Sequence, residues 1–220
     1  MIHPHTELRR IDPVMGYGVF ATALIPKGTL VFVKDPFDIE VTPEQFDTMD
    51  DLLKIQTERY SYIDERGIRI VSWDMAKYVN HRCDCNTIST GYGFEIALRD
   101  IQAGEEVSDE YGLFNMTEPM TLTCACPNCR GQLKPDDIDT YYLEWDRKIQ
   151  DALIQTTVVA QPLWSLLDAD TMEQLTGYLE HNLPYKSVVS LKSVAVPHII
   201  ELKEVLPQLK QGHRHKSREH

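Results

Sequence analysis

Three cysteines, Cys124, Cys126 and Cys129, lie within six residues and flank a Pro-Asn pair that favours a turn. Two cysteines this close can form a redox pair, but three around a turn can supply sulfur ligands to one tetrahedral zinc ion. The fourth ligand is missing locally, and Cys83 and Cys85 lie far upstream. A zinc site would therefore join two distant segments, and its loss would unfold that region. A reduced cysteine cluster without metal is the alternative.

Other residues that could do chemistry have ordinary structural interpretations when each is taken alone. Gly16 and Gly18 flank Tyr17 before a β-rich run, where they could form a turn or let a ligand lie against bare backbone. Asn80 and His81 could be a turn residue and a structural histidine. Tyr111 could be a half-buried aromatic. None of these residues defines a reaction by itself.

The elements that must position these residues are mainly short strands. Before residue 135, β-rich runs separated by Gly and Pro turns are expected at 18–23, 29–34, 68–72 and 94–98. One helix begins at Thr42, where Pro43 and Gln45 complete a capping box before an apolar stripe. That stripe consists of Phe46, Met49, Leu52 and Leu53. Many short strands with little helix argue against a Rossmann-type layout.

After residue 135 the apolar residues recur every three or four positions, which is typical of amphipathic helices. The first helix should begin near Asp136 to Asp139, and the second should cover Thr171 to His181. Two further helical stretches are expected at 187–194 and 197–209, and residues 212–220 are expected to be a disordered tail. A boundary near Lys134 is therefore predicted, and the sequence leaves open whether the helices pack on the first part or bind a partner.

Four segments taken in order resemble the SET-domain protein lysine methyltransferases and their cysteine-rich post-SET segment. The segments are GYGVFA with IPKGTLVF, KYVNHRCDCN, ALRDIQAGEEVSDEYG and CACPNCRGQL. The resemblance implies a mainly β SET fold, with small sheets around a knot-like crossing, followed by an all-helical extension. We therefore expect a SET domain at 1–133 with its post-SET segment at about 120–133, a helical region at 134–211 and a tail at 212–220.

The resemblance also assigns roles to individual residues. S-adenosylmethionine would be bound by Gly16, Tyr17, Gly18, Asn80, His81 and Leu133, the last covering one side of the cofactor. Tyr111 falls on the catalytic tyrosine of the family. One structural zinc ion would be held by Cys83, Cys124, Cys126 and Cys129. Cys85 stands where relatives usually have proline, so it is the candidate for the unpaired thiol.

The chain also departs from the family pattern at three positions. Arg82 replaces a small serine, and it could pair with a carboxylate or face outward. Glu110 replaces an aspartate before the tyrosine, which is a mild change. Asp109 stands where many relatives carry a Phe or Tyr that limits how many methyl groups the lysine accepts. An aspartate there either attracts the substrate ammonium or points away, so the number of methyl groups is not predicted.

The implied reaction is methyl transfer to a neutral lysine amine. Free lysine has a pKa of about 10.4, so only about one side chain in a thousand is nucleophilic at neutral pH. Burial in an aromatic channel near a positive sulfonium lowers that pKa, and no strong protein base is then required. Tyr111 would align the reacting atoms, aided by aromatics that the sequence does not rank. These are Tyr60, Tyr62 and Tyr92.

The amino-acid composition indicates which classes of partner are expected. The 220 residues include 22 Lys and Arg against 34 Asp and Glu, a net charge of −12. Because no basic block precedes the last nine residues, direct binding to duplex nucleic acid is not expected. A cationic partner fits the charge better, and the resemblance implies a lysine-containing protein, such as a histone or another basic protein. No apolar stretch could span a bilayer and no secretory signal begins the chain, so we expect an intracellular protein, cytoplasmic, nuclear or nucleoid, without membrane binding.

Two alternatives remain from the sequence. The SET fold could be catalytically inactive and bind a basic peptide, which the changes at Arg82 and Asp109 permit. The zinc turn and the helices could instead form an interaction platform, with an oligomer made through the helical region. A metal-dependent hydrolase is disfavoured, because four sulfur ligands leave no position for an activated water.

Overall fold

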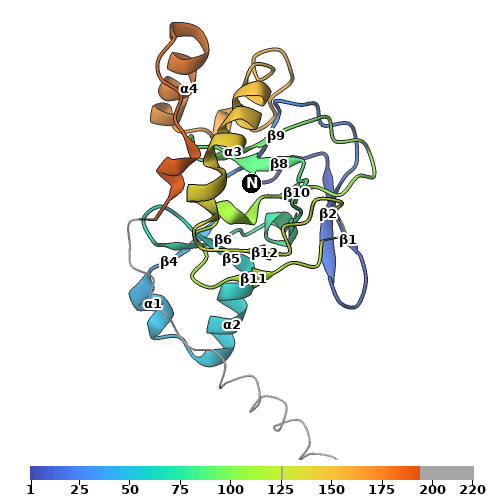
Figure 1. The fold of residues 1–220 in the computed structure, drawn as a ribbon, viewed down its shortest axis with the longest axis vertical. Coiled ribbons are helices and arrows are strands. Elements are labelled where there is room, and N and C mark those ends of the chain that lie inside the picture. The colour runs from blue at the N-terminus through green and yellow to red at the C-terminus, as the bar shows by residue number, and fades with distance from the viewer. Residues whose placement is uncertain (125, 194–220) are drawn as a thin grey trace, which may run out of the picture.

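The computed structural model describes residues 1–124 and 126–193, and small β-sheets make up most of the regular secondary structure before residue 134 (Figure 1). A two-stranded antiparallel sheet joins β1 (Thr6–Arg10) and β2 (Tyr17–Ala21). One three-stranded sheet has the order β3 (Leu30–Val33), β9 (Phe94–Ala97) and β8 (Thr87–Ser89). The other has the order β4 (Ile39–Val41), β6 (Arg69–Val71) and β5 (Ser61–Ile63). The mainly β fold with a helical extension is confirmed.

Two further strand pairs bring distant parts of the chain together. β7 (Asn80–His81) runs parallel to β10 (Ser108–Asp109), so that His81 lies opposite Asp109. β11 (Met120–Thr121) pairs with β12 (Gln132–Leu133) and closes the loop that carries three cysteines. A 3₁₀ turn, Tyr111–Leu113, follows β10 directly. The knot-like crossing that the resemblance implies stays a prediction.

The expected strands are present, although each is shorter than its apolar run. The capping box at Thr42 is also present, and it begins α1 (Pro43–Asp47). The single helix predicted there is wrong, because Asp50 caps a second helix, α2 (Asp51–Tyr60), by accepting a hydrogen bond from the backbone of Leu53. The predicted apolar stripe is broken at this point. Phe46 is buried, but Leu52 and Leu53 are more than half exposed.

The helices after residue 135 follow the sequence pattern closely. The predicted first helix is α3 (Asp137–Leu153), and the second is α4 (Ala169–His181), which ends at Asn182 in the left-handed region. Short 3₁₀ turns occur at Met75–Tyr78, Trp164–Leu166 and Val188–Leu191. The last of these stands where a helix at 187–194 was predicted. The predictions for 194, 197–209 and 212–220 lie outside the described residues.

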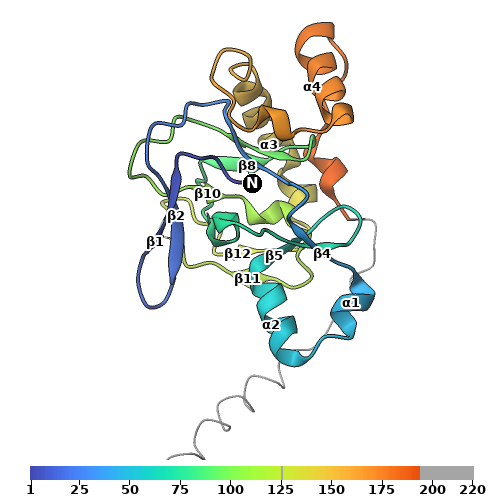
Figure 2. The same cartoon turned by 180° about the vertical axis from the view of Figure 1, so that it is seen from behind.

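The described helices pack directly on the β-part of the chain. In Figures 1 and 2, α3 lies beside β8 in both views, and Figure 1 also shows β9 next to it. One hydrophobic core contains residues of β3, β8 and β9 together with apolar residues of α3, α4 and the last 3₁₀ turn. Ile149 and Leu153 are fully buried, and burial of each such side chain stabilises the fold by about 1.5–3 kcal/mol. No helix in the described ranges is long and apolar enough to cross a membrane.

A buried carboxylate on α3 fixes the segment that follows α4. Asp146 accepts hydrogen bonds from the Tyr185 hydroxyl at 3.0 Å, the Ser187 hydroxyl at 2.6 Å and the backbone amide of Val188 at 3.0 Å. These three donors come from one short stretch, and Asp146 itself is 7% exposed. The side chain therefore holds the end of the described chain against the core.

Replacing this carboxylate should destabilise the whole domain. In Asp146→Ala, three donors lose their partner in a buried place, so we expect the free energy of unfolding in urea to fall by about 2–4 kcal/mol. Asp151→Ala on the same helix is the matched control, because its exposed ion pair with Lys27 should contribute only about 0–1 kcal/mol. Equal effects of the two substitutions would contradict the role given to Asp146.

Candidate functional site

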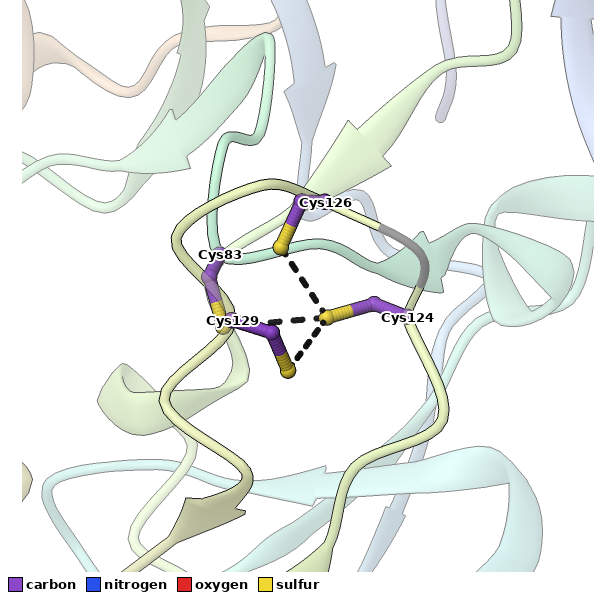
Figure 3. Close-up of side chains that lie close together, drawn as sticks. All are labelled: Cys83, Cys124, Cys126 and Cys129. Carbon is purple, nitrogen blue, oxygen red and sulfur yellow. Dashed lines mark hydrogen bonds between the residues drawn. The ribbon is translucent and has the colours of Figure 1, made fainter.

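Four cysteines from two distant segments converge on one point. The sulfurs of Cys83, Cys124, Cys126 and Cys129 all lie within 4.8 Å of one another (Figure 3). Cys124 is central, at 3.2 Å from the sulfurs of Cys126 and Cys129 and 3.8 Å from that of Cys83. With Zn–S bonds of about 2.3 Å, sulfurs around a tetrahedral zinc ion lie roughly 3.8 Å apart. The group could therefore form a zinc site with limited movement, and Cys85 is not among its members.

The surroundings favour the thiolate form that binds metal at Cys124, whereas burial raises the pKa of Cys126 to about 11. The backbone amide of Arg130 donates to the Cys83 sulfur at 3.4 Å, and that of Gly131 donates to the Cys129 sulfur at 3.3 Å. Burial tends to raise the pKa of Cys124, but hydrogen bonds involving Cys83 and the other two cysteines outweigh it and lower that pKa to about 7. An all-sulfur donor set with such support fits a structural zinc ion.

Arg130 connects the cysteine loop to two other parts of the chain. Its guanidinium pairs with Glu110, the residue before Tyr111, and lies 3.3 Å from a carboxylate oxygen of Asp137 at the start of α3. It also stacks over Tyr141 and Trp145 of α3, with its central carbon 5.0 and 5.9 Å from the two ring centres. Sequence reasoning missed this role, because nothing local to Arg130 indicates a partner on a helix.

Tyr111 is held from several sides. Its hydroxyl donates a hydrogen bond to the backbone carbonyl of Val79, and its backbone amide donates to Nδ1 of His81 at 3.3 Å. The Phe114 ring lies 4.9 Å from the tyrosine ring. Burial raises the pKa of Tyr111, and the nearby carboxyl group of Asp109 raises it further. The phenol is therefore a neutral group whose hydroxyl position is fixed.

The predicted cofactor residues are partly brought together. The Asn80 side chain donates to the backbone carbonyl of Tyr17 at 3.1 Å and to the Glu106 carboxylate at 2.8 Å. A Cβ atom at Gly18 would lie 2.7 Å from an oxygen of that carboxylate and 2.7 Å from the end of the Ile11 side chain, so a larger residue there would displace both side chains. Gly16 differs, because its φ of 80° requires glycine while the space beside it is open. Glu106, missed in the sequence, orients Asn80.

A cavity of about 950 Å³ opens beside Tyr111. Its walls include Tyr111 and Val79, and Tyr60 and Tyr62 bring aromatic surface to it. Tyr92, proposed with them from the sequence, lies instead in the core, where its ring stacks on Phe94 with centres 6.2 Å apart. A smaller cavity of about 380 Å³ adjoins the first, because both are lined by the same five residues. These are Phe32, Tyr62, Ile63, Glu95 and Phe114.

The predicted cofactor residues lie around this cavity rather than in its described walls. Asn80 directly follows Val79, a wall residue, and Leu133 pairs across the strands with Met120, which also lines the cavity. The ring of Tyr17 lies 5.9 Å from that of Tyr78, which lies 5.4 Å from that of Tyr60 at the cavity wall. An aromatic row therefore leads from the Gly16 turn to the cavity.

The two consequential departures from the family pattern have different outcomes. Arg82 forms a two-point ion pair with Asp84, at 2.9 and 3.1 Å, on the surface of the protein. Asp109 is 1% exposed, lines the larger cavity and has Glu95 as its neighbour there. The residue thus borders the cavity, with its carboxyl group buried. Glu95 was missed, because in the sequence it is only one polar residue in a strand.

Comparison with known proteins identifies the family of this region. A family model described as SET domain matches residues 16–112. The chain is also similar to the variant-silencing SET domain-containing protein of Plasmodium falciparum (isolate 3D7), with 33% identity over 141 residues. That match covers 56% of this chain but spans only 5% of the relative's length.

The cysteine group leads to a test of metal content. Protein purified without chelator should carry one zinc ion per chain, measured by plasma mass spectrometry, because four thiolates fill a tetrahedral shell. Cys124→Ser removes the central sulfur and should lower zinc affinity at least about tenfold, since losing even an outer-shell partner costs that much. Cys85→Ser should leave the zinc content unchanged. An unchanged zinc affinity in Cys124→Ser, measured by competition with a chelator, would contradict the site.

Proposed function

Because residues 16–112 form a SET domain, we propose that the protein is a protein-lysine N-methyltransferase that uses S-adenosylmethionine. The observation that carries the proposal is the position of Tyr111. It lies in the wall of a cavity large enough for a side chain and part of a cofactor, with its hydroxyl fixed on the Val79 carbonyl. This residue also falls on the catalytic tyrosine of the family that the sequence resembles.

The chain offers a plausible binding surface for the cofactor. Gly16 leaves open space at its turn, Tyr17 is about half exposed, and the aromatic row of Tyr17, Tyr78 and Tyr60 could face a cationic sulfonium. We propose that these groups, with Gly18, Asn80, His81 and Leu133, bind S-adenosylmethionine. The cofactor supplies a methyl group that is activated by its positive sulfur.

The work of the protein is then to present a neutral amine in the correct line. Phe32, Tyr62 and Phe114 give the cavity apolar walls that can hold the aliphatic part of a lysine. The Tyr111 hydroxyl and the Val79 carbonyl form a fixed pair of polar groups beside it. Such positioning lowers the activation barrier, because the amine and the methyl group have already lost their translational and rotational entropy on binding.

The substrate is proposed to be a basic protein, with histones as the first candidates. The net charge of −12 favours a cationic partner, while the cavity walls carry charges of both signs. Among the wall residues, Glu58 pairs with Arg69, and Glu118 adds a negative charge. The similar Plasmodium protein is described as variant-silencing, which is a property of that protein. We include histones as a candidate on the family resemblance and this charge alone.

A catalytically inactive module that binds a basic peptide is the second candidate. The buried carboxyl group of Asp109 favours it, because a cation can be held there without any reaction. Calorimetry with S-adenosylmethionine separates the two candidates. Measurable binding of the cofactor supports the enzyme, whereas its absence together with binding of a histone peptide supports the module.

Tyr111→Phe tests the proposed enzyme directly. Loss of the hydroxyl should reduce methyl transfer by about 100-fold or more, because small errors in alignment carry costs of that size. Transfer is measured with labelled S-adenosylmethionine on a histone mixture and on a lysate of the source cells. Calorimetric affinity for the cofactor should stay nearly the same.

Tyr142→Phe is the matched control, since Tyr142 lies on α3 and packs at the edge of the hydrophobic core. It should retain the rate of the unmodified protein. If Tyr111→Phe also retained that rate, the catalytic assignment of Tyr111 would be wrong.

A further inference from the structure

Two carboxyl groups meet at the wall of the larger cavity. Asp109, on β10, is 1% exposed, and apart from its neighbour Glu95 no described side chain forms a hydrogen bond with either of its carboxylate oxygens. Glu95, on β9, lines both cavities and lies within hydrogen-bonding reach of Asp109. Tyr111 lines the same cavity. An acid pair without a cationic partner therefore faces the space beside the fixed tyrosine.

The charge state of this pair follows from its burial. A hydrogen bond between two carboxyl groups requires a proton on one of them, and two like charges this close cannot both persist in a buried place. Burial, with a smaller contribution from Asp74, raises the pKa of Glu95 to about 7. Burial and then the charge of Glu95 raise the pKa of Asp109. Near neutral pH the pair thus holds at least one proton, and above the pKa of Glu95 it carries one negative charge.

Other titratable groups surround the pair and do not neutralise it with a positive side chain. Glu110, Asp74, Tyr62 and Tyr111 are acidic or neutral neighbours, and the amino group of Met1 contributes a weak positive field at Glu95. Among these, Glu110 is already paired with Arg130, and the Met1 amino group is paired with Asp35. Arg59, Arg69 and Lys77 also line this cavity, but in the described part of the chain none of them forms an ion pair with Glu95 or Asp109, and Arg69 pairs with Glu58. The negative charge of the pair therefore has no direct cationic partner among the described residues.

Buried carboxylates without partners reduce stability, so their presence needs a compensating interaction. A ligand cation entering the cavity would provide it. The walls beside the pair are apolar and aromatic, with Phe32, Tyr62 and Phe114 positioned to contact an alkyl chain. An alkylammonium group has this combination of an apolar stem and a charged end.

We propose that Glu95 and Asp109 form a subsite that binds the ammonium group of the substrate lysine and accepts a proton from it. The binding half of this inference stands on the cavity and the acid pair, and the proton transfer rests on the proposed methyltransferase function. It also gives a role to Asp109, which stands where the resemblance leads one to expect an aromatic residue.

The proposed step balances in atoms and charge. One N–H bond of the lysine ammonium breaks, and its proton goes to the carboxylate oxygen of the pair, leaving a neutral amine and a neutral pair. The nitrogen lone pair then forms the N–C bond while the C–S electrons remain on sulfur, which becomes a thioether. The methylated ammonium leaves, and the pair returns its proton to solvent through the cavity.

Methyl transfer by Asp109→Asn and Glu95→Gln tests proton acceptance. At pH 7.5 each variant should transfer methyl groups to a histone mixture at least about tenfold more slowly, with unchanged affinity for S-adenosylmethionine. The rate of each variant should keep rising up to about pH 9.5, because the free-amine fraction in solution grows tenfold per pH unit below its pKa. The rate of the unmodified protein should level off above neutrality. Unchanged rates and pH profiles in both variants would overturn the proposal.

Glu173→Gln is the matched control, because it removes an exposed carboxylate on α4 outside the cavity walls and should change neither rate nor profile. Whether the variants are folded can be checked by measuring their thermal unfolding temperatures. A carboxyl group whose pKa is raised on folding costs stability as pH rises from its unfolded to its folded pKa, about 4.3 to about 7 for Glu95. Glu95→Gln should therefore melt at the same or a higher temperature than the unmodified protein at pH 8.

A binding experiment keeps this inference separate from the proposed function. In an NMR titration with n-butylammonium, amide signals of cavity residues should shift and saturate in the unmodified protein, but not in Asp109→Asn or Glu95→Gln. Neutral 1-pentanol should bind equally to all three proteins. If the cation binds none of them, or all of them equally, the subsite is rejected. If the unmodified protein transfers no methyl groups, the enzyme proposal fails while this titration still decides the cation subsite.

Discussion

One guanidinium, that of Arg130, meets carboxylates from two separate parts of the chain and the faces of two aromatic rings on α3. A buried ion pair gives little net stability against an apolar alternative, but loss of one partner costs about 3–5 kcal/mol. Removing Arg130 would leave Glu110 and Asp137 buried and unpaired. The arrangement therefore works mainly as a geometric constraint, which fixes the cysteine loop against the segment that carries Tyr111.

The same constraint explains why the helical region belongs to the site and is not an independent appendage. Any side chain at Gly112 would approach the Trp145 ring to 2.9 Å, so the helix sits directly on the residue after Tyr111. The shared core of β3, β8, β9, α3 and α4 supports this contact from behind. Damage to the helices should thus reach the tyrosine through packing, although no described residue of α3 or α4 lines the larger cavity.

Local signals in the sequence were enough to predict many elements of the fold. The capping box at Thr42, the apolar period of α3 and the cysteine spacing each depend on neighbours within a few residues, and each is present in the structure. The new helix start at Asp50 was missed because two competing caps stand close together. Arg130 and Glu95 could not be found, since their partners are distant in sequence and only the folded chain shows which carboxylate has a cation.

Asp109 and Glu110 are neighbours in one extended segment, but one side chain has a structural role and the other borders the cavity. Successive side chains of an extended segment point to opposite sides. Glu110 faces inward to Arg130, where its charge is matched, and Asp109 faces the cavity, where none of the described side chains matches it. The fold can satisfy a buried carboxylate here, because it does so one residue later. The carboxyl group of Asp109, which shares one negative charge with Glu95, is thus available to a ligand in the cavity, and the position of the neighbouring Tyr111 makes an amine the fitting one.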